Sequence, residues 1–115
     1  MVVKKGEVWW ASLGEPRGSE PGYKRPVVIV SANEFNKSTI KTVIVAVITS
    51  NLRLAEAPGN FSVSKKDSGL AKESVVNISQ LLTLDKSFLV EKSKKIPELK
   101  LIRLNEGLKL VLSIQ

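Results

Sequence analysis

Residues 43–48 form the longest unbroken apolar run in the chain, and this run constrains the fold more than any other segment. It lies inside a stretch rich in β-branched residues, 42–50, that is apolar on both faces a strand would present. A strand of this kind needs cover on both sides, so we expect it to be central in a buried sheet. Because the run is far too short to cross a bilayer, it does not indicate a membrane span.

Shorter β-forming segments surround this central strand. We expect strands at residues 7–12, 27–30, 61–64 and 74–78, and two more at 81–84 and 88–90 joined by a turn at 85–86. The Gly- and Pro-rich segment 13–24 and the polar segment 51–60 are predicted loops, and 31–40 is a connection with a helical turn at 32–36.

The C-terminal segment changes from strand to helical periodicity. From Pro97 onward, aliphatic residues recur every three or four positions, which is typical of one apolar helix face. Pro97 suits the first helical position, whereas Gly107 should weaken the helix interior. Many short strands followed by one helix predict a single mainly β domain over residues 1–115, a small curled antiparallel barrel with the helix beside it.

The composition excludes several kinds of chemistry. The chain has no Cys and no His, so disulfides, cysteine nucleophiles and the commonest metal ligand are absent, and we expect neither a metal site nor a cofactor. Eighteen Lys and Arg against eleven Asp and Glu give a net charge of +7. This excess favours a polyanionic partner, nucleic acid first, although it also serves solubility. Early charges such as Lys4 and Lys5 do not fit a secretory signal, so we expect a cytoplasmic protein.

Two polar segments lie at the ends of apolar strands. The first, residues 18–26, carries a carboxylate, a hydroxyl and two cations, and Pro26 favours an extended conformation for Arg25. The second is 49–51 (Thr-Ser-Asn), where the buried strand meets a loop. Taken singly, each residue also fits an ordinary strand-end or loop role. Together they predict a polar site at one rim of the barrel.

In this order, the segments resemble the MazF/PemK family of toxin endoribonucleases from type II toxin–antitoxin systems. The resemblance covers nearly the whole chain, and its most specific part runs from Gly18 to Pro26. The matching segments are 5–10 (Lys-Gly-Glu-Val-Trp-Trp), 14–20 (Gly-Glu-Pro-Arg-Gly-Ser-Glu), 24–31 (Lys-Arg-Pro-Val-Val-Ile-Val-Ser), 47–50 (Val-Ile-Thr-Ser) and 80–86 (Gln-Leu-Leu-Thr-Leu-Asp-Lys).

The resemblance implies an SH3-like barrel of the CcdB/MazF type with a C-terminal helix, a likeness that also implies a homodimer. It implies metal-independent, sequence-specific cleavage of single-stranded RNA, which inhibits translation and growth, and a MazE-like antitoxin whose acidic segment occupies the RNA site. By motif position, Arg25 and Thr49 correspond to the family's catalytic arginine and threonine, and Glu20 to its loop glutamate. We expect RNA contacts from Ser19, Tyr23, Lys24, Ser50, Asn51, Arg53 and Gln80.

The aromatic residues divide between core and surface. Trp9 and Trp10 are neighbours on a strand and must face opposite ways, so one is expected in the core and the other at a dimer or antitoxin surface. Tyr23, in the loop, is the better candidate for stacking on a base.

The implied reaction is attack of the RNA 2′-hydroxyl on the adjacent phosphate, which leaves a 2′,3′-cyclic end. The fork of Arg25 can bond two phosphate oxygens, and Thr49 can donate one hydroxyl hydrogen bond. A guanidinium stays protonated in proteins, so Glu20 is the alternative base and the base assignment stays open.

Two non-catalytic alternatives share the barrel: a toxin of the gyrase-poison type, and an SH3-like module that binds a peptide or nucleic acid. Gyrase poisons resemble one another in a tryptophan-containing tail, which this chain lacks.

Overall fold

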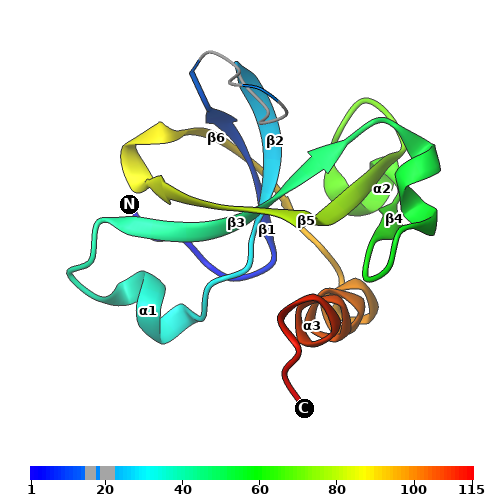
Figure 1. Ribbon diagram of the computed structural model, residues 1–115. Helices are drawn as coiled ribbons and strands as arrows, with labels where there is room; N and C mark the ends of the chain where they lie inside the picture. The colour runs from blue at the N-terminus through cyan, green and yellow to red at the C-terminus, as the bar shows by residue number, and fades with distance from the viewer. Residues whose placement is uncertain (15–17, 19–22) are drawn as a thin grey trace.

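A computed structural model describes residues 1–14, 18 and 23–115 of the chain. Six strands of this part form one antiparallel sheet in the order β4-β5-β3-β2-β1-β6, and Figure 1 shows the sheet strongly curled with the C-terminal helix at one side. The strands are β1 (Glu7–Ser12), β2 (Lys24–Ile29), β3 (Thr42–Thr49), β4 (Phe61–Val63), β5 (Ser74–Asp85) and β6 (Leu89–Lys95). The helices are α1 (Asn33–Lys37), α2 (Lys65–Ser68) and α3 (Glu98–Leu112), with 3₁₀-helices η1 (Leu52–Glu56) and η2 (Lys86–Phe88). The predicted mainly β class, a curled sheet with a C-terminal helix, is confirmed.

Strand β3 occupies the central position that its apolar faces predicted. It pairs with β2 on one side and β5 on the other. Val45 of β3 belongs to an apolar core enclosed by the curl of the sheet, together with Leu84 of β5 and Leu89 of β6. Ala46 belongs to a second core on the opposite face, which α3 covers through the fully buried Leu104. The two cores explain why both faces of β3 had to be apolar.

Strand β5 is one long strand where the sequence predicted two short ones. Ala46 pairs with Leu81 but the next residue, Val47, pairs with Asn77, so residues 78–80 have no partner in β3. Such a bulge bends a strand without ending it. The polar residues Ser79 and Gln80 within it made the strand look interrupted in the sequence.

Other boundaries also differ from the prediction. Strand β2 begins at Lys24, not at Val27, because Lys24 and Arg25 still pair with β1. Strand β6 runs to Lys95; its second half is charged because it lies at the edge of the sheet, where lysines discourage pairing with another chain. The segment predicted as loop 51–60 contains η1, and α2 was not predicted.

Helix α3 begins at Glu98, one residue after Pro97. Gly107 is buried where the helix crosses the turn before β4, and a Cβ added there would overlap the carbonyl oxygen of Gly59. The glycine therefore permits close packing of the helix, which outweighs its poor helix propensity.

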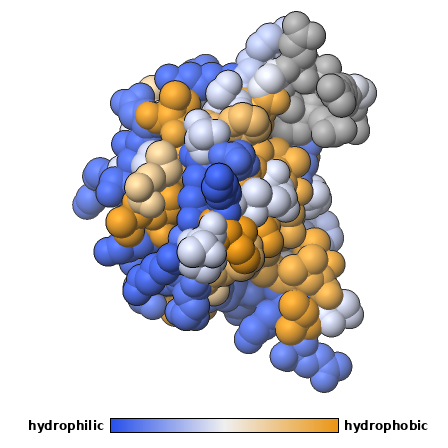
Figure 2. Space-filling view, turned by 90° about the vertical axis from the view of Figure 1, so that its left-hand side faces the viewer, coloured by the Kyte–Doolittle hydropathy of each residue, from blue (hydrophilic) through white to orange (hydrophobic). Residues whose placement is uncertain are grey.

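The C-terminal end of α3 exposes apolar side chains. Leu110, Leu112 and the following Ile114 are each at least half exposed, and Figure 2 shows apolar surface gathered at this end of the molecule. No helix in the described ranges is long and apolar enough to span a membrane.

Candidate active site

Strands β2 and β3 pair over only part of their length. The ladder joins residues 27–29 to 45–47 and stops there, although β2 starts at Lys24 and β3 continues to Thr49. Pro26, the residue next to the last pair, has no N–H to donate to a ladder. Beyond it the two strands diverge: in Figure 1 the start of β2 lies at the top, whereas the end of β3 lies to the right. A wedge therefore opens between the start of β2 and the end of β3.

A cavity of about 420 Å³ lies in this wedge and brings together four of the predicted residues. Tyr23, Lys24 and Arg25 line it from β2 and its approach, and Ser50 lines it from the end of β3. The ammonium of Lys24 lies 5.5 Å from the centre of the Trp10 ring, which forms another part of the wall. The predicted meeting of two polar strand ends at one rim is thus observed for these residues.

Thr49 stands beside the cavity, between two residues that line it, Ile48 and Ser50. Thr49 itself is not one of the lining residues. Arg25 lies two residues before Val27 and Thr49 lies two residues after Val47, the last pair of the β2–β3 ladder, so both belong to the strand ends that border the wedge. The Thr49 Oγ1 accepts a hydrogen bond from the Asn51 N–H at 3.1 Å, and its own hydrogen can still be donated.

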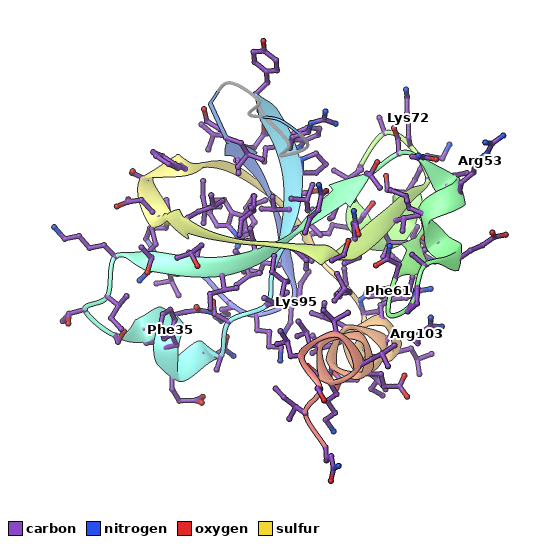
Figure 3. The ribbon with its side chains drawn as sticks, viewed as in Figure 1. Phe35, Arg53, Phe61, Lys72, Lys95 and Arg103 are labelled. Atoms are coloured by element: carbon purple, nitrogen blue, oxygen red, sulfur yellow. The ribbon has the colours of Figure 1, made fainter. Side chains whose placement is uncertain are left out.

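Asn51 and Arg53 belong to the turn that follows β3. The Asn51 side chain caps η1 by accepting a hydrogen bond from the Arg53 N–H at 3.2 Å. Figure 3 shows Arg53 projecting outward from η1, away from β2. Arg53 therefore does not line the cavity.

Gln80 lies in the bulge of β5, across β3 from the cavity. Its Oε1 accepts a hydrogen bond from Asn77 Nδ2 at 3.2 Å, and Asn77 Oδ1 in turn accepts from Ser79 and Asn60. Asn60 also donates to the Leu54 carbonyl in η1, so this network ties the bulge to the turn after β3. The structure does not bring Gln80 into the cavity.

Two predicted residues, Ser19 and Glu20, lie outside the described residues. Within the ranges 1–14 and 23–115 and at position 18, no group of three His, Cys, Asp or Glu side chains could hold a metal. Asp85 lies at the other end of β5, and hydrogen bonds from Ser87 lower the pKa of this exposed carboxyl.

Lys72 and Leu70 line the cavity but were not predicted to belong to the site. They come from the segment between α2 and β5, and only the pairing of β5 with β3 carries that segment to the wedge. No local sequence signal marks this placement. Trp9 is buried, as expected for one of the two tryptophans, whereas Trp10 is half-buried, packs against the second core and lines the cavity.

A family model described as the PemK-like, MazF-like toxin of type II toxin–antitoxin systems matches residues 4–112. The chain belongs to this toxin family. Endoribonuclease MazF6 of Mycobacterium tuberculosis is 39% identical to this PemK/MazF chain over 114 residues, covering 99% of the chain and 100% of the relative. Endoribonuclease EndoA of Bacillus subtilis is 32% identical, covering 99% and 97%.

Solved structures share the PemK/MazF fold. An endoribonuclease in complex with its cognate antitoxin, from a mycobacterial species, superposes with a TM-score of 0.81 at 22% identity, covering 98% of this chain and 97% of that one. MazF from Deinococcus radiodurans superposes with a TM-score of 0.79 at 22% identity, covering 98% of each chain.

Proposed function

We propose that this chain, an endoribonuclease of the PemK/MazF toxin family, cuts single-stranded RNA at short motifs without a metal ion. The observation that carries the proposal is the wedge between β2 and β3, where Arg25 lines a cavity together with Lys24 and Lys72, and Thr49 lies between two further lining residues, Ile48 and Ser50. The net charge of +7 supports an RNA substrate, since a basic protein attracts a polyanion.

The reaction needs three functions around one phosphate: a base, an acid, and a group that stabilises the charge on the phosphate oxygens. The 2′-oxygen of the upstream nucleotide forms a bond to phosphorus and loses its proton to a base. The bond from phosphorus to the 5′-oxygen then breaks, and that oxygen takes up a proton. The products are a 2′,3′-cyclic phosphate and a 5′-hydroxyl, so no water and no metal enter this step.

Arg25 and Thr49 stabilise the charge that develops on the phosphate oxygens. The guanidinium of Arg25 can bond two oxygens in one plane, and the Thr49 hydroxyl, which already accepts from Asn51, supplies a further hydrogen bond. Glu20 is proposed as a supporting residue and as the alternative base to Arg25, because a carboxylate can take the 2′-proton whereas a guanidinium stays protonated.

A cognate antitoxin is the proposed protein partner. The structural relatives include an endoribonuclease bound to its cognate antitoxin. An acidic segment of such a partner would meet the cations Lys24, Arg25 and Lys72 at the wedge and compete there with RNA. RNA cleavage by the free protein would then stop translation and growth until the antitoxin binds.

The test is incubation of the purified protein with a long RNA in excess chelator. We expect a small set of discrete fragments, and we expect the Thr49→Val protein, which has lost the hydroxyl but kept its shape, to yield almost none. Loss of cutting in chelator that added metal restores would contradict the metal-independent proposal. A parent protein that binds RNA but never cuts it would favour a non-catalytic module.

A further inference from the structure

We propose that Asn60, a buried residue outside the cavity, is a positioning residue for RNA cleavage. Its side-chain amide holds the turn after β3 in the place where that turn hydrogen-bonds Thr49. The inference rests on the proposed function, because Thr49 acts in that same site. It goes beyond that function by giving a role to a residue that does not meet the RNA.

The hydroxyl of Thr49 is set by the turn that follows it. The Asn51 N–H donates to Thr49 Oγ1 at 3.1 Å, and the Asn51 side chain accepts from the Arg53 N–H at 3.2 Å. A hydroxyl oxygen that accepts from a fixed N–H is held in place and can still donate its own hydrogen. The position of that hydroxyl therefore depends on where the turn holds Asn51.

This turn has little apolar packing of its own. The 3₁₀-helix η1 contains no buried residue, and Leu52 is 54% exposed. Backbone hydrogen bonds of 3.1 Å follow one another along the turn, each N–H donating to the carbonyl three residues earlier, through Asn51, Leu54, Ala57 and Asn60. These local bonds give the segment its shape, but they do not fix its position on the sheet. An anchor on the sheet is needed for that.

Asn60 supplies the anchor. It is 3% exposed, and its Oδ1 accepts from the Ile78 N–H of β5 at 2.8 Å. Its Nδ2 donates to the Leu54 carbonyl in η1 at 2.8 Å and to Asn77 Oδ1 at 3.2 Å. These contacts require an amide, because one side of the group must accept and the other must donate twice.

Strand β5 thereby holds the site at two points. Val75 of β5 pairs with Thr49 itself, and Asn60 links the same strand to η1. Hydrogen bonds made by a buried amide do little more than offset its desolvation, but a fully satisfied network fixes one geometry. Because the geometry fixed here is that of the turn beside Thr49, losing it should reduce the cleavage rate.

The test variant is Asn60→Asp, which keeps the shape of the side chain. One carboxylate oxygen still accepts from the Ile78 N–H, but the other faces the Leu54 carbonyl, which cannot donate to it. This repulsion should release η1 from the sheet. In single-turnover cleavage at saturating protein, we expect the rate to fall by about 10- to 100-fold, the scale of a misplacement of about 1 Å.

Asn77→Asp is the control for the added charge. Asn77 Oδ1 already accepts from Asn60 and Ser79, and the Gln80 amide can turn to donate to the new carboxylate. The contact between Asn60 and Leu54 is therefore kept. Its rate should stay within about threefold of the parent rate, and its RNA affinity should match that of Asn60→Asp.

Asn36→Asp is the control for lost stability. Asn36 is also 3% exposed, and its Nδ2 donates to the Ser31 carbonyl at 2.9 Å, but it lies in α1, before the other end of β3. Urea unfolding should show a loss of stability in both this variant and Asn60→Asp. Only Asn60→Asp should lose cleavage rate.

A double variant tests whether Asn60 acts through Thr49. In the Thr49→Val protein the hydroxyl is already gone, so adding Asn60→Asp should lower the residual rate by less than about threefold. A residue that only stabilised the fold would lower the rate by the same factor in both backgrounds.

Hydrogen exchange tests the anchor without RNA. The Asn51 and Arg53 amides should exchange about 3- to 10-fold faster in Asn60→Asp, whereas residues 43–47 of β3 should not change. If Asn60→Asp does not fold, Asn77→Ala decides. It removes one of the three partners of Asn60, and it should raise the same exchange rates and lower the cleavage rate by about 3- to 10-fold.

Unchanged exchange in the turn, or a folded Asn60→Asp enzyme that cuts as fast as the parent, would overturn the inference. An equal loss of rate in Asn36→Asp or Asn77→Asp would overturn it too, because stability or charge would then account for the effect. Cutting of RNA by the parent keeps the proposed function standing in each of these cases. A parent that never cuts RNA refutes the proposed function itself.

Discussion

Arg25 lies where β2 has left β3 but still pairs with β1. It faces Ala11 in that pairing and lines the cavity, so its backbone is held on one side while its side chain is exposed to a ligand. An arginine in this position can act as a surface charge that attracts RNA, or it can grip the reacting phosphate through two oxygens.

Replacing Arg25 with Lys separates these roles, because the charge stays and the two-pronged hydrogen bonding is lost. If the guanidinium grips the phosphate, Arg25→Lys should lose roughly 2 to 4 kcal/mol of transition-state stabilisation, about 30- to 1,000-fold in rate, with RNA affinity little changed. Single-turnover cleavage of a short RNA, with affinity measured separately, checks this. A folded Arg25→Lys enzyme that cuts within threefold of the parent would reduce Arg25 to a binding charge.

Single residues of the site differed in how well the sequence predicted them. Tyr23, Lys24 and Arg25 are consecutive and precede an apolar strand, so local pattern was enough to predict that they lie together at one rim, and they line one cavity. Lys72 looked like an ordinary surface lysine, because its place at the cavity depends on how β5 pairs with β3. Gln80 was predicted from its motif position to contact RNA. It lies in the bulge of β5, across β3 from the cavity, and does not line the cavity.

The elements were predictable where one physical requirement decided them. A short run that is apolar on both faces and rich in β-branched residues favours a central strand, and β3 is one. The spacing of the C-terminal aliphatic residues predicted a helix that begins at Pro97, and α3 begins one residue later, at Glu98. Strand β5 was not predictable as one element, because a bulge has no sequence pattern of its own and its polar residues mimic a loop.

Gly107 tests the packing of α3 at this scale. In an isolated helix, Gly→Ala stabilises by about 0.5–1 kcal/mol, but here the new methyl would overlap the Gly59 carbonyl oxygen. We therefore expect Gly107→Ala to destabilise the protein by about 1–3 kcal/mol, the usual cost of overpacking. Urea unfolding measures the change, with Glu106→Ala at the exposed neighbouring position as control. A stabilised Gly107→Ala protein would show that the helix does not need this close contact.

At the scale of the whole molecule, the apolar surface and the basic site lie in different places. Exposed apolar side chains gather at the end of α3 and on β6, including Leu110, Leu112 and Val90, whereas the cations line the wedge. We expect a homodimer formed through apolar surface, burying about 1,200–2,000 Å² in total. Sedimentation should then show a dimer at micromolar concentration whose stability changes little with salt. A protein that stays monomeric, or a dimer that salt dissociates, would contradict this expectation.

The identity of the RNA ends tests the central claim most directly, because it records which bonds formed and broke. If the chain's own side chains promote attack by the 2′-hydroxyl, every fragment made in excess chelator should end in a 2′,3′-cyclic phosphate, and its downstream neighbour should begin with a 5′-hydroxyl. A substrate with a single 2′-deoxy sugar at the cut site should then remain intact. Fragments that begin with a 5′-phosphate, or continued cutting of the 2′-deoxy substrate, would contradict the account.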